Sequence, residues 1–176
     1  MNEKVRELAK KVEQRLAGRF AEIDEDAALN TEKVMDSFRK HRVSDSMFAG
    51  TTGYGYDDLG RETLDKIYAD VFGAESAIVR TGIVNGTHAI ACALFAACEP
   101  GKTLLSISGM PYDTILSTIG VTGDYFGSLR YYGVGFDHVD LKADGSPDIE
   151  AIRIRAADEN VCAVAIQRSR GNAARP

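Results

Sequence analysis

Apolar residues recur along the first forty positions at steps of three or four, the spacing of one face of an α-helix. Over residues 3–22 this stripe comprises Val5, Leu8, Val12, Leu16 and Phe20. A second set predicts another helix over residues 26–41, and this helix ends in basic residues, as the helix dipole favours. The pattern therefore predicts two amphipathic helices, which need a surface to pack on, either in the same domain or on a partner subunit.

Beyond residue 60 the pattern alternates between helical stretches and short apolar runs. Helices are expected over residues 61–72, 87–98, 113–119 and 148–157. Strands are expected within residues 103–108, 131–139 and 161–167. Gly73 follows the first of these helices, at a position that favours a left-handed residue. Strands that alternate with helices in this way predict an α/β domain with a largely parallel sheet.

A glycine-bearing loop leads from the apolar run at 77–80 into the helix expected at 87–98. Such a helix start presents free backbone N–H groups at its positive end, where a phosphate can bind. Asn85 or Thr87 can cap the helix, and Gly86 allows the backbone to approach a ligand closely. An ordinary loop-to-helix junction with a polar cap explains the same residues, so both interpretations stay open.

The stretch at 48–60 combines several glycines with Tyr54 and Tyr56. Its irregular pattern predicts neither a strand nor a helix. A loop of this composition either lines a binding site or runs through solvent with its tyrosines packed on the surface.

Composition narrows the class of protein. With 176 residues, 44% of them hydrophobic and 27% charged, the chain is long enough for one domain with a core. A net charge of −5 argues against a nucleic-acid surface, and no apolar run approaches the length of a membrane span. Three cysteines without a C-x-x-C pair indicate a reducing compartment, so a cytoplasmic location is expected. The three histidines are scattered, and no metal site is expected.

Four motifs together resemble one family. They are FAGTTGYGYDDLGR at 48–61, NGTHAI at 85–90, GMPYD at 109–113 and QRSRG at 167–171. They resemble the pyridoxal-phosphate family known as aluminium-resistance or methionine gamma-lyase family proteins, a branch of the cystathionine lyase group within fold type I. The resemblance implies an N-terminal helical segment at 1–47, followed at 48–176 by an incomplete large α/β domain that binds pyridoxal 5'-phosphate.

The resemblance also implies roles for single residues. Asn85, Gly86 and Thr87 match the residues that hold the cofactor phosphate, and Tyr112 matches the tyrosine that stacks on its pyridine ring. Tyr56 resembles the tyrosine that reaches the phosphate of a neighbouring subunit's cofactor.

The arginine that normally accompanies Tyr56 would fall at Asp58 in this chain, and Arg61 is close enough to replace it. Tyr54, Arg168 and Arg170 are expected to bind substrate, although solvated surface arginines fit the last two equally well.

The family's Schiff-base lysine and pyridinium-binding aspartate follow the QRSRG segment, and this sequence ends five residues after it. No catalytic residue is therefore assigned, and we expect the N-terminal part of a longer enzyme, inactive alone. The implied reaction is elimination across the C–S bond of a sulfur amino acid such as methionine or cystathionine, in a homodimer or homotetramer. The alternatives are a non-catalytic oligomerising fragment and a phosphate-binding α/β module.

Overall fold

The computed structural model describes residues 2–52, 58–122 and 126–169. The chain forms two compact units, Met1–Thr81 and Gly82–Pro176. The expected division into a helical segment at 1–47 and an α/β domain at 48–176 stays a prediction, because a compact unit is defined by its contacts and not by independent folding.

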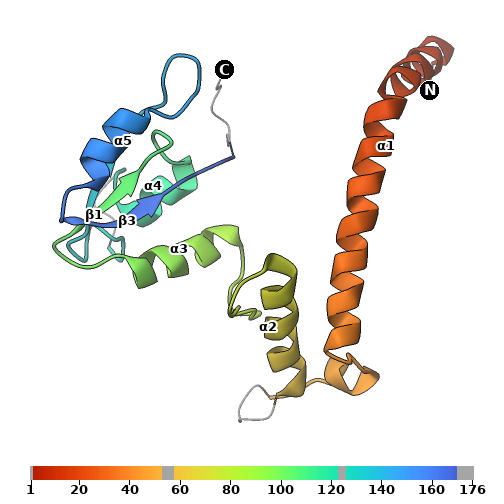
Figure 1. Ribbon diagram of the computed structural model, residues 1–176, viewed down its shortest axis with the longest axis horizontal. Helices are drawn as coiled ribbons and strands as arrows, with labels where there is room; N and C mark the ends of the chain where they lie inside the picture. The colour runs from red at the N-terminus through yellow and green to blue at the C-terminus, as the bar shows by residue number, and fades with distance from the viewer. Residues whose placement is uncertain (1, 53–57, 123–125, 170–176) are drawn as a thin grey trace. The chain divides into compact units, whose positions relative to one another are not determined.

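The first unit is helical (Figure 1). Its elements are α1 (Glu3–Lys40), the short 3-10 helix η1 (Asp45–Phe48) and α2 (Leu59–Phe72). The prediction of two separate helices before residue 41 is wrong, since α1 is continuous. The acidic segment at 22–26 contains neither proline nor glycine, so nothing in it ends the helix. Thr31 lies inside α1 and donates its hydroxyl to the Ala27 carbonyl.

Polar side chains join α1 to α2. The Asp70 carboxylate accepts hydrogen bonds from Lys40 Nζ at 2.8 Å and lies 2.6 Å from His41 Nε2. Ile67 and Ala69 of α2 are buried. The helix ends at Gly73, whose φ of 65° confirms the predicted left-handed residue.

The second unit contains a three-stranded parallel sheet in the order β2-β1-β3. The strands are β1 (Thr103–Ser106), β2 (Gly135–His138) and β3 (Val161–Ala165). The helices are α3 (Gly86–Ala97), α4 (Asp113–Ile119) and α5 (Ile149–Ala156). The predicted α/β class, with a parallel sheet, is confirmed, and every predicted helix and strand beyond residue 60 is present within a few residues.

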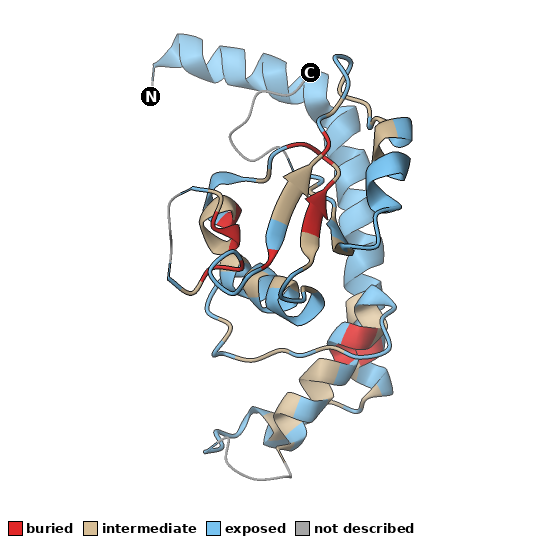
Figure 2. Cartoon of the chain, turned by 90° about the vertical axis from the view of Figure 1, so that its left-hand side faces the viewer, coloured by how far each residue is buried: buried red, intermediate tan, exposed pale blue. Residues whose placement is uncertain are grey.

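One hydrophobic cluster of this unit lies on the face of the sheet that carries Leu104, while Leu105 is buried on the opposite face. Leu104 of the central strand is 1% exposed and packs in a cluster with Ile115, Ile119, Leu129 and Val134. Figure 2 shows the buried positions of this unit gathered around the central strand and α4. The face of β1 that carries Leu104 is therefore covered by α4 and its following loop, with α3 adding partly buried side chains.

Candidate functional site

The carboxyl ends of the strands are tied together by one glutamine. Beyond the end of β3, the Gln167 amide donates to Ser108 Oγ at 2.9 Å, in the loop that follows β1. Gln167 Oε1 in turn accepts a hydrogen bond from the Tyr112 amide at 2.8 Å. Gln167 therefore fixes the loop between β1 and α4 against the end of β3. Sequence reasoning gave Gln167 no role of its own, although a polar residue directly after a buried strand marks this edge of a parallel sheet.

The start of α3 lies beside the start of α4. Asn85 Oδ1 accepts from the His88 amide at 2.8 Å, so Asn85 is the helix cap. Thr87 Oγ1 is 3.4 Å from Thr114 Oγ1 in the first turn of α4. Within the part of the chain that the structure describes, the amides of Gly86 and Thr87 donate to no acceptor. These two N–H groups are thus available at the positive end of α3.

Tyr112 is the N-cap residue of α4, and its backbone is held by Gln167. Its side chain is 36% exposed and forms no ring contact with any other described residue. A Cβ added at Gly86 would meet nothing within 4 Å, so the space beside that backbone is open. The edge therefore offers an uncommitted aromatic ring near uncommitted amides.

An apolar cavity of about 190 Å³ lies under this edge, between the sheet and the two helices. Its walls come from α3, α4 and the strands, with Ser106 and Gln167 as the polar members. Ser106 Oγ donates to the Gly109 carbonyl at 2.7 Å, so its hydroxyl is already satisfied. The cavity itself is therefore hydrophobic, and the polar chemistry of the edge comes from the helix starts and Gln167.

Comparison with known proteins decides the family. Residues 5–176 match the sequence pattern described as methionine gamma-lyase. The chain belongs to this methionine gamma-lyase family.

Similar proteins agree with that assignment. The uncharacterized protein YnbB of Bacillus subtilis (strain 168) is 46% identical over 99% of this chain and 41% of its own length. A carbon-sulfur lyase involved in aluminium resistance from Clostridium novyi NT superposes with a TM-score of 0.90 at 42% identity, over 96% of this chain and 41% of its own. A Bacillus cereus protein gives a TM-score of 0.92 at 47% identity, over 99% of this chain and 42% of its own. The chain thus spans about two-fifths of the length of these relatives.

The site residues expected from the family are only partly brought together. Asn85, Gly86, Thr87 and Tyr112 lie at one edge of the sheet, and Arg168, which is exposed, follows Gln167 there. Tyr54, Tyr56 and Arg170 lie outside the described residues. Their expected roles stay predictions.

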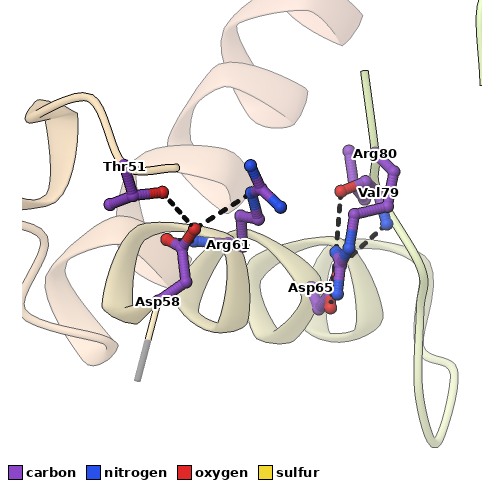
Figure 3. Close-up of polar contacts among 6 residues, drawn as sticks. All are labelled: Thr51, Asp58, Arg61, Asp65, Val79 and Arg80. Atoms are coloured by element: carbon purple, nitrogen blue, oxygen red, sulfur yellow. Dashed lines mark hydrogen bonds and ion pairs between the residues drawn. The ribbon is translucent and has the colours of Figure 1, made fainter. Parts of the chain in front are cut away.

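Arg61, the suggested replacement for a missing arginine, is committed to Asp58 in the first unit (Figure 3). Its Nε lies 3.0 Å from Asp58 Oδ2, and Thr51 Oγ1 donates to the same oxygen at 2.6 Å. Asp58 also caps α2 by accepting from the Arg61 amide at 3.2 Å. The hydrogen bonds from Thr51 and from the Arg61 amide, in that order, lower the pKa of Asp58 below its ordinary value. Part of the Arg61 guanidinium is therefore already used inside the unit.

A second carboxylate in Figure 3 fixes the segment after α2. Asp65 Oδ1 accepts from the Val79 amide at 2.7 Å, and both Asp65 oxygens lie within 2.9 Å of Arg80 Nη1. The Arg80 hydrogen bond is the main reason that the pKa of Asp65 is lowered, and the Asp65 hydrogen bond raises that of Arg80. Asp65 thus anchors the chain on its way to the second unit.

The described residues offer neither a metal site nor a membrane-spanning helix. No group of three or more His, Cys, Asp or Glu side chains is arranged to hold a metal ion there. Among the same residues, no helix is both long enough and apolar enough to cross a bilayer.

Proposed function

We propose that this chain is the N-terminal part of a pyridoxal-phosphate-dependent carbon-sulfur lyase of fold type I, and that it supplies the phosphate-binding edge of the cofactor site. The observation that carries the proposal is the meeting of the α3 start, the α4 start and the end of β3 at one edge, through Thr87, Thr114, Tyr112 and Gln167. Ligands of open α/β sheets bind at the carboxyl ends of the strands, which agrees with this edge.

The residues at the edge fit the cofactor's two ends. The free amides of Gly86 and Thr87 and the Thr87 hydroxyl would bind the phosphate, with the α3 dipole favouring its negative charge. Asn85 would act by holding the helix start open through its bond to His88. The ring of Tyr112 would stack on the pyridine, because its backbone is fixed by Gln167 and its ring has no described partner.

When bound, pyridoxal phosphate supplies an electron sink that stabilises negative charge on the substrate's α-carbon. The part of this chain is to hold and orient. Exposed Arg168, at the same edge, would bind the substrate carboxylate, a contact that arginine makes in bidentate form. Activity on a sulfur amino acid, a cytoplasmic location and a homodimeric or homotetrameric assembly are proposed for the longer protein of the relatives' length.

The test compares three ligands on this chain by hydrogen exchange: pyridoxal 5'-phosphate, pyridoxal and inorganic phosphate. We expect the phosphorylated aldehyde and phosphate to slow exchange at residues 85–88, and pyridoxal to have no such effect. The first turn of α5, at residues 149–151, is the internal control, since it is another helix start of the same unit capped by an aspartate. Equal protection of both helix starts, or protection by pyridoxal, would show nonspecific binding and overturn the proposal.

Two substitutions separate a cofactor site from a simple phosphate site. Thr87→Val should weaken the binding of pyridoxal phosphate and of inorganic phosphate by about 10–100-fold, because it removes one hydrogen bond to a charged group. Thr118→Val is the matched control, since the Thr118 hydroxyl donates to the Thr114 carbonyl inside α4. Tyr112→Ala should weaken pyridoxal phosphate by about 3–10-fold and leave phosphate unchanged, while Tyr112→Phe retains binding. If Tyr112→Ala changes the affinity for neither pyridoxal phosphate nor inorganic phosphate, a phosphate-binding module explains the site better than a lyase does.

A further inference from the structure

The N-terminal half of α1 carries an apolar stripe that the described residues of its unit leave exposed. Its side chains are between 41% and 63% exposed; they are Val5, Leu8, Val12, Leu16, Phe20 and Ile23. At 100° per residue all six lie on one face of the helix. The same face continues to Ser37 and His41, where it packs on α2. The covered end of this face is thus continuous with an uncovered one.

The stripe is symmetric in sequence about residue 14. Val5 and Ile23 are equally far from that centre, as are Leu8 and Phe20, and Val12 and Leu16. Two copies of α1 laid antiparallel, with a two-fold axis at residue 14, therefore place every apolar side chain of one copy opposite an apolar side chain of the other. Such a pair is a closed, isologous interface, the commonest form of homo-oligomer contact.

Charge distinguishes the antiparallel pair from a parallel one. The flanks of the stripe are basic at one end, with Lys4 and Arg6, and acidic at the other, with Glu22 and Asp24. Lys4 and Glu22 are 18 residues apart, which is five full turns, so they lie on the same flank; Arg6 and Asp24 share the opposite flank.

In an antiparallel pair each flank brings the basic end of one copy to the acidic end of the other. In a parallel pair opposite flanks meet, so Lys4 of one copy would lie beside Arg6 of the other, and Glu22 beside Asp24.

We propose that the face of α1 from Val5 to Ile23 is the docking surface for a second copy of this chain, in antiparallel orientation about residue 14. The paired segment is roughly 27 Å long, from 18 residue steps of 1.5 Å. Near the axis Lys11 of one copy comes close to Arg15 of the other on the same flank, so these central charges oppose the antiparallel pair and its direction rests on the charges at the two ends. The proposal does not depend on the cofactor.

Cross-linking between two different variants tests the direction. Val5→Cys and Ile23→Cys chains are mixed, treated with a short bismaleimide and digested, and the joined peptides are identified by mass spectrometry. We expect a link from position 5 of one variant to position 23 of the other, which only an intermolecular contact can form. Val5→Cys alone should give no 5-to-5 link, because those positions lie roughly 27 Å apart in the antiparallel pair. A 5-to-5 link would establish a parallel pair and overturn the proposal.

Sedimentation tests the face itself. Leu8→Glu with Leu16→Glu should weaken self-association at least tenfold, while Leu29→Glu, at an exposed apolar position off the stripe, should leave it unchanged. Lys4→Glu with Arg6→Glu should weaken the dimer, and adding Glu22→Lys with Asp24→Lys should restore it. Circular dichroism checks that each variant keeps its helix. If the native chain sediments as a monomer at all concentrations, the stripe is covered within the same chain and the proposal is wrong.

Discussion

The two units of this chain are stabilised by different means. Among the described residues, the buried apolar side chains of the first unit are Ile67 and Ala69, whereas those of the second are Leu104, Leu105, Ile115, Ile119, Leu129, Val134 and Val139. In the first unit, three aspartates bind neighbouring segments, at positions 58, 65 and 70. Substitutions that remove buried apolar volume should therefore destabilise the second unit most, and substitutions that remove a charged side chain should destabilise the first unit most.

This difference also bears on function. The second unit supplies a rigid edge on which Gln167 and Tyr112 are held by hydrogen bonds. The first unit leaves a long helix with most of its apolar face open. A rigid edge suits ligand binding, whereas an open helical face suits assembly.

The largest effect is expected from a cavity in the second unit. Leu104→Ala should lower the free energy of unfolding of that unit by about 3–4 kcal/mol, because a fully buried leucine is truncated in a packed cluster. Val164→Ala on β3 is the matched control: Val164 is 48% exposed, and its loss should cost about 1 kcal/mol or less. Hydrogen exchange of the strand amides measures both variants. Equal effects would show that the sheet does not depend on this core.

Two glycines give the next contrast. Gly120 ends α4 with a φ of 89°, and an added Cβ there would overlap the Ser128 side chain. Gly120→Ala should therefore destabilise the second unit by about 2–3 kcal/mol, from the left-handed backbone and the overlap together.

Gly73 has a similar φ of 65°, but an added Cβ would meet nothing within 4 Å. Gly73→Ala should cost the first unit only about 1 kcal/mol, the backbone part alone. Thermal or chemical unfolding, monitored by hydrogen exchange in each unit, compares the two variants. If Gly73→Ala lowers the free energy of unfolding more than Gly120→Ala does, the close contact with Ser128 does not explain the requirement for glycine at position 120.

Sequence reasoning succeeded where the signal is local. The helix starting after Asn85 and the left-handed Gly73 were both predicted, because capping and glycine preferences act within a few residues. The same reasoning failed at residues 22–26, where it predicted a boundary between two helices although every residue there can continue a helix.

The candidate site was predicted in part for a related reason. Motifs identified Gly86, Thr87 and Tyr112. Gln167 belongs to the QRSRG motif, but its bonding role emerged only from the structure, since its partners Ser108 and Tyr112 lie more than fifty residues away along the chain. A contact of that separation leaves no periodic or capping pattern in a single sequence.

Loss of the Asp65 charge in the first unit should lower stability less than loss of the Leu104 side chain in the second. Asp65→Asn retains the shape of the side chain and removes its ion pair with Arg80, which should cost about 1 kcal/mol at pH 7 since Arg80 is partly exposed. The pKa of Asp65 is lowered in the folded state, so its contribution is present above the ordinary aspartate pKa and is lost as the pH falls through the lower folded value.

The difference between the native chain and Asp65→Asn should therefore shrink below about pH 4. Hydrogen exchange of the Val79 region as a function of pH measures it. Lys66→Gln is the control, because it alters the neighbouring charge on an exposed side chain. A difference that grows in acid would contradict the assigned role of the carboxylate.

The smallest effect is expected at a residue that is buried yet weakly bonded. Ser37 is the single buried polar residue among the described residues of the first unit, but its hydroxyl lies 3.5 Å from Asp70 Oδ2, at the limit of a hydrogen bond. Asp70 is held instead by Lys40 and His41, at 2.8 and 2.6 Å, and their hydrogen bonds, Lys40 first, lower its pKa. Ser37→Ala should therefore change stability by less than about 0.5 kcal/mol, since the higher helix propensity of alanine offsets the weak bond. If this substitution instead destabilises the unit as much as Asp70→Asn does, then the serine, and not the ion pairs, holds α1 against α2.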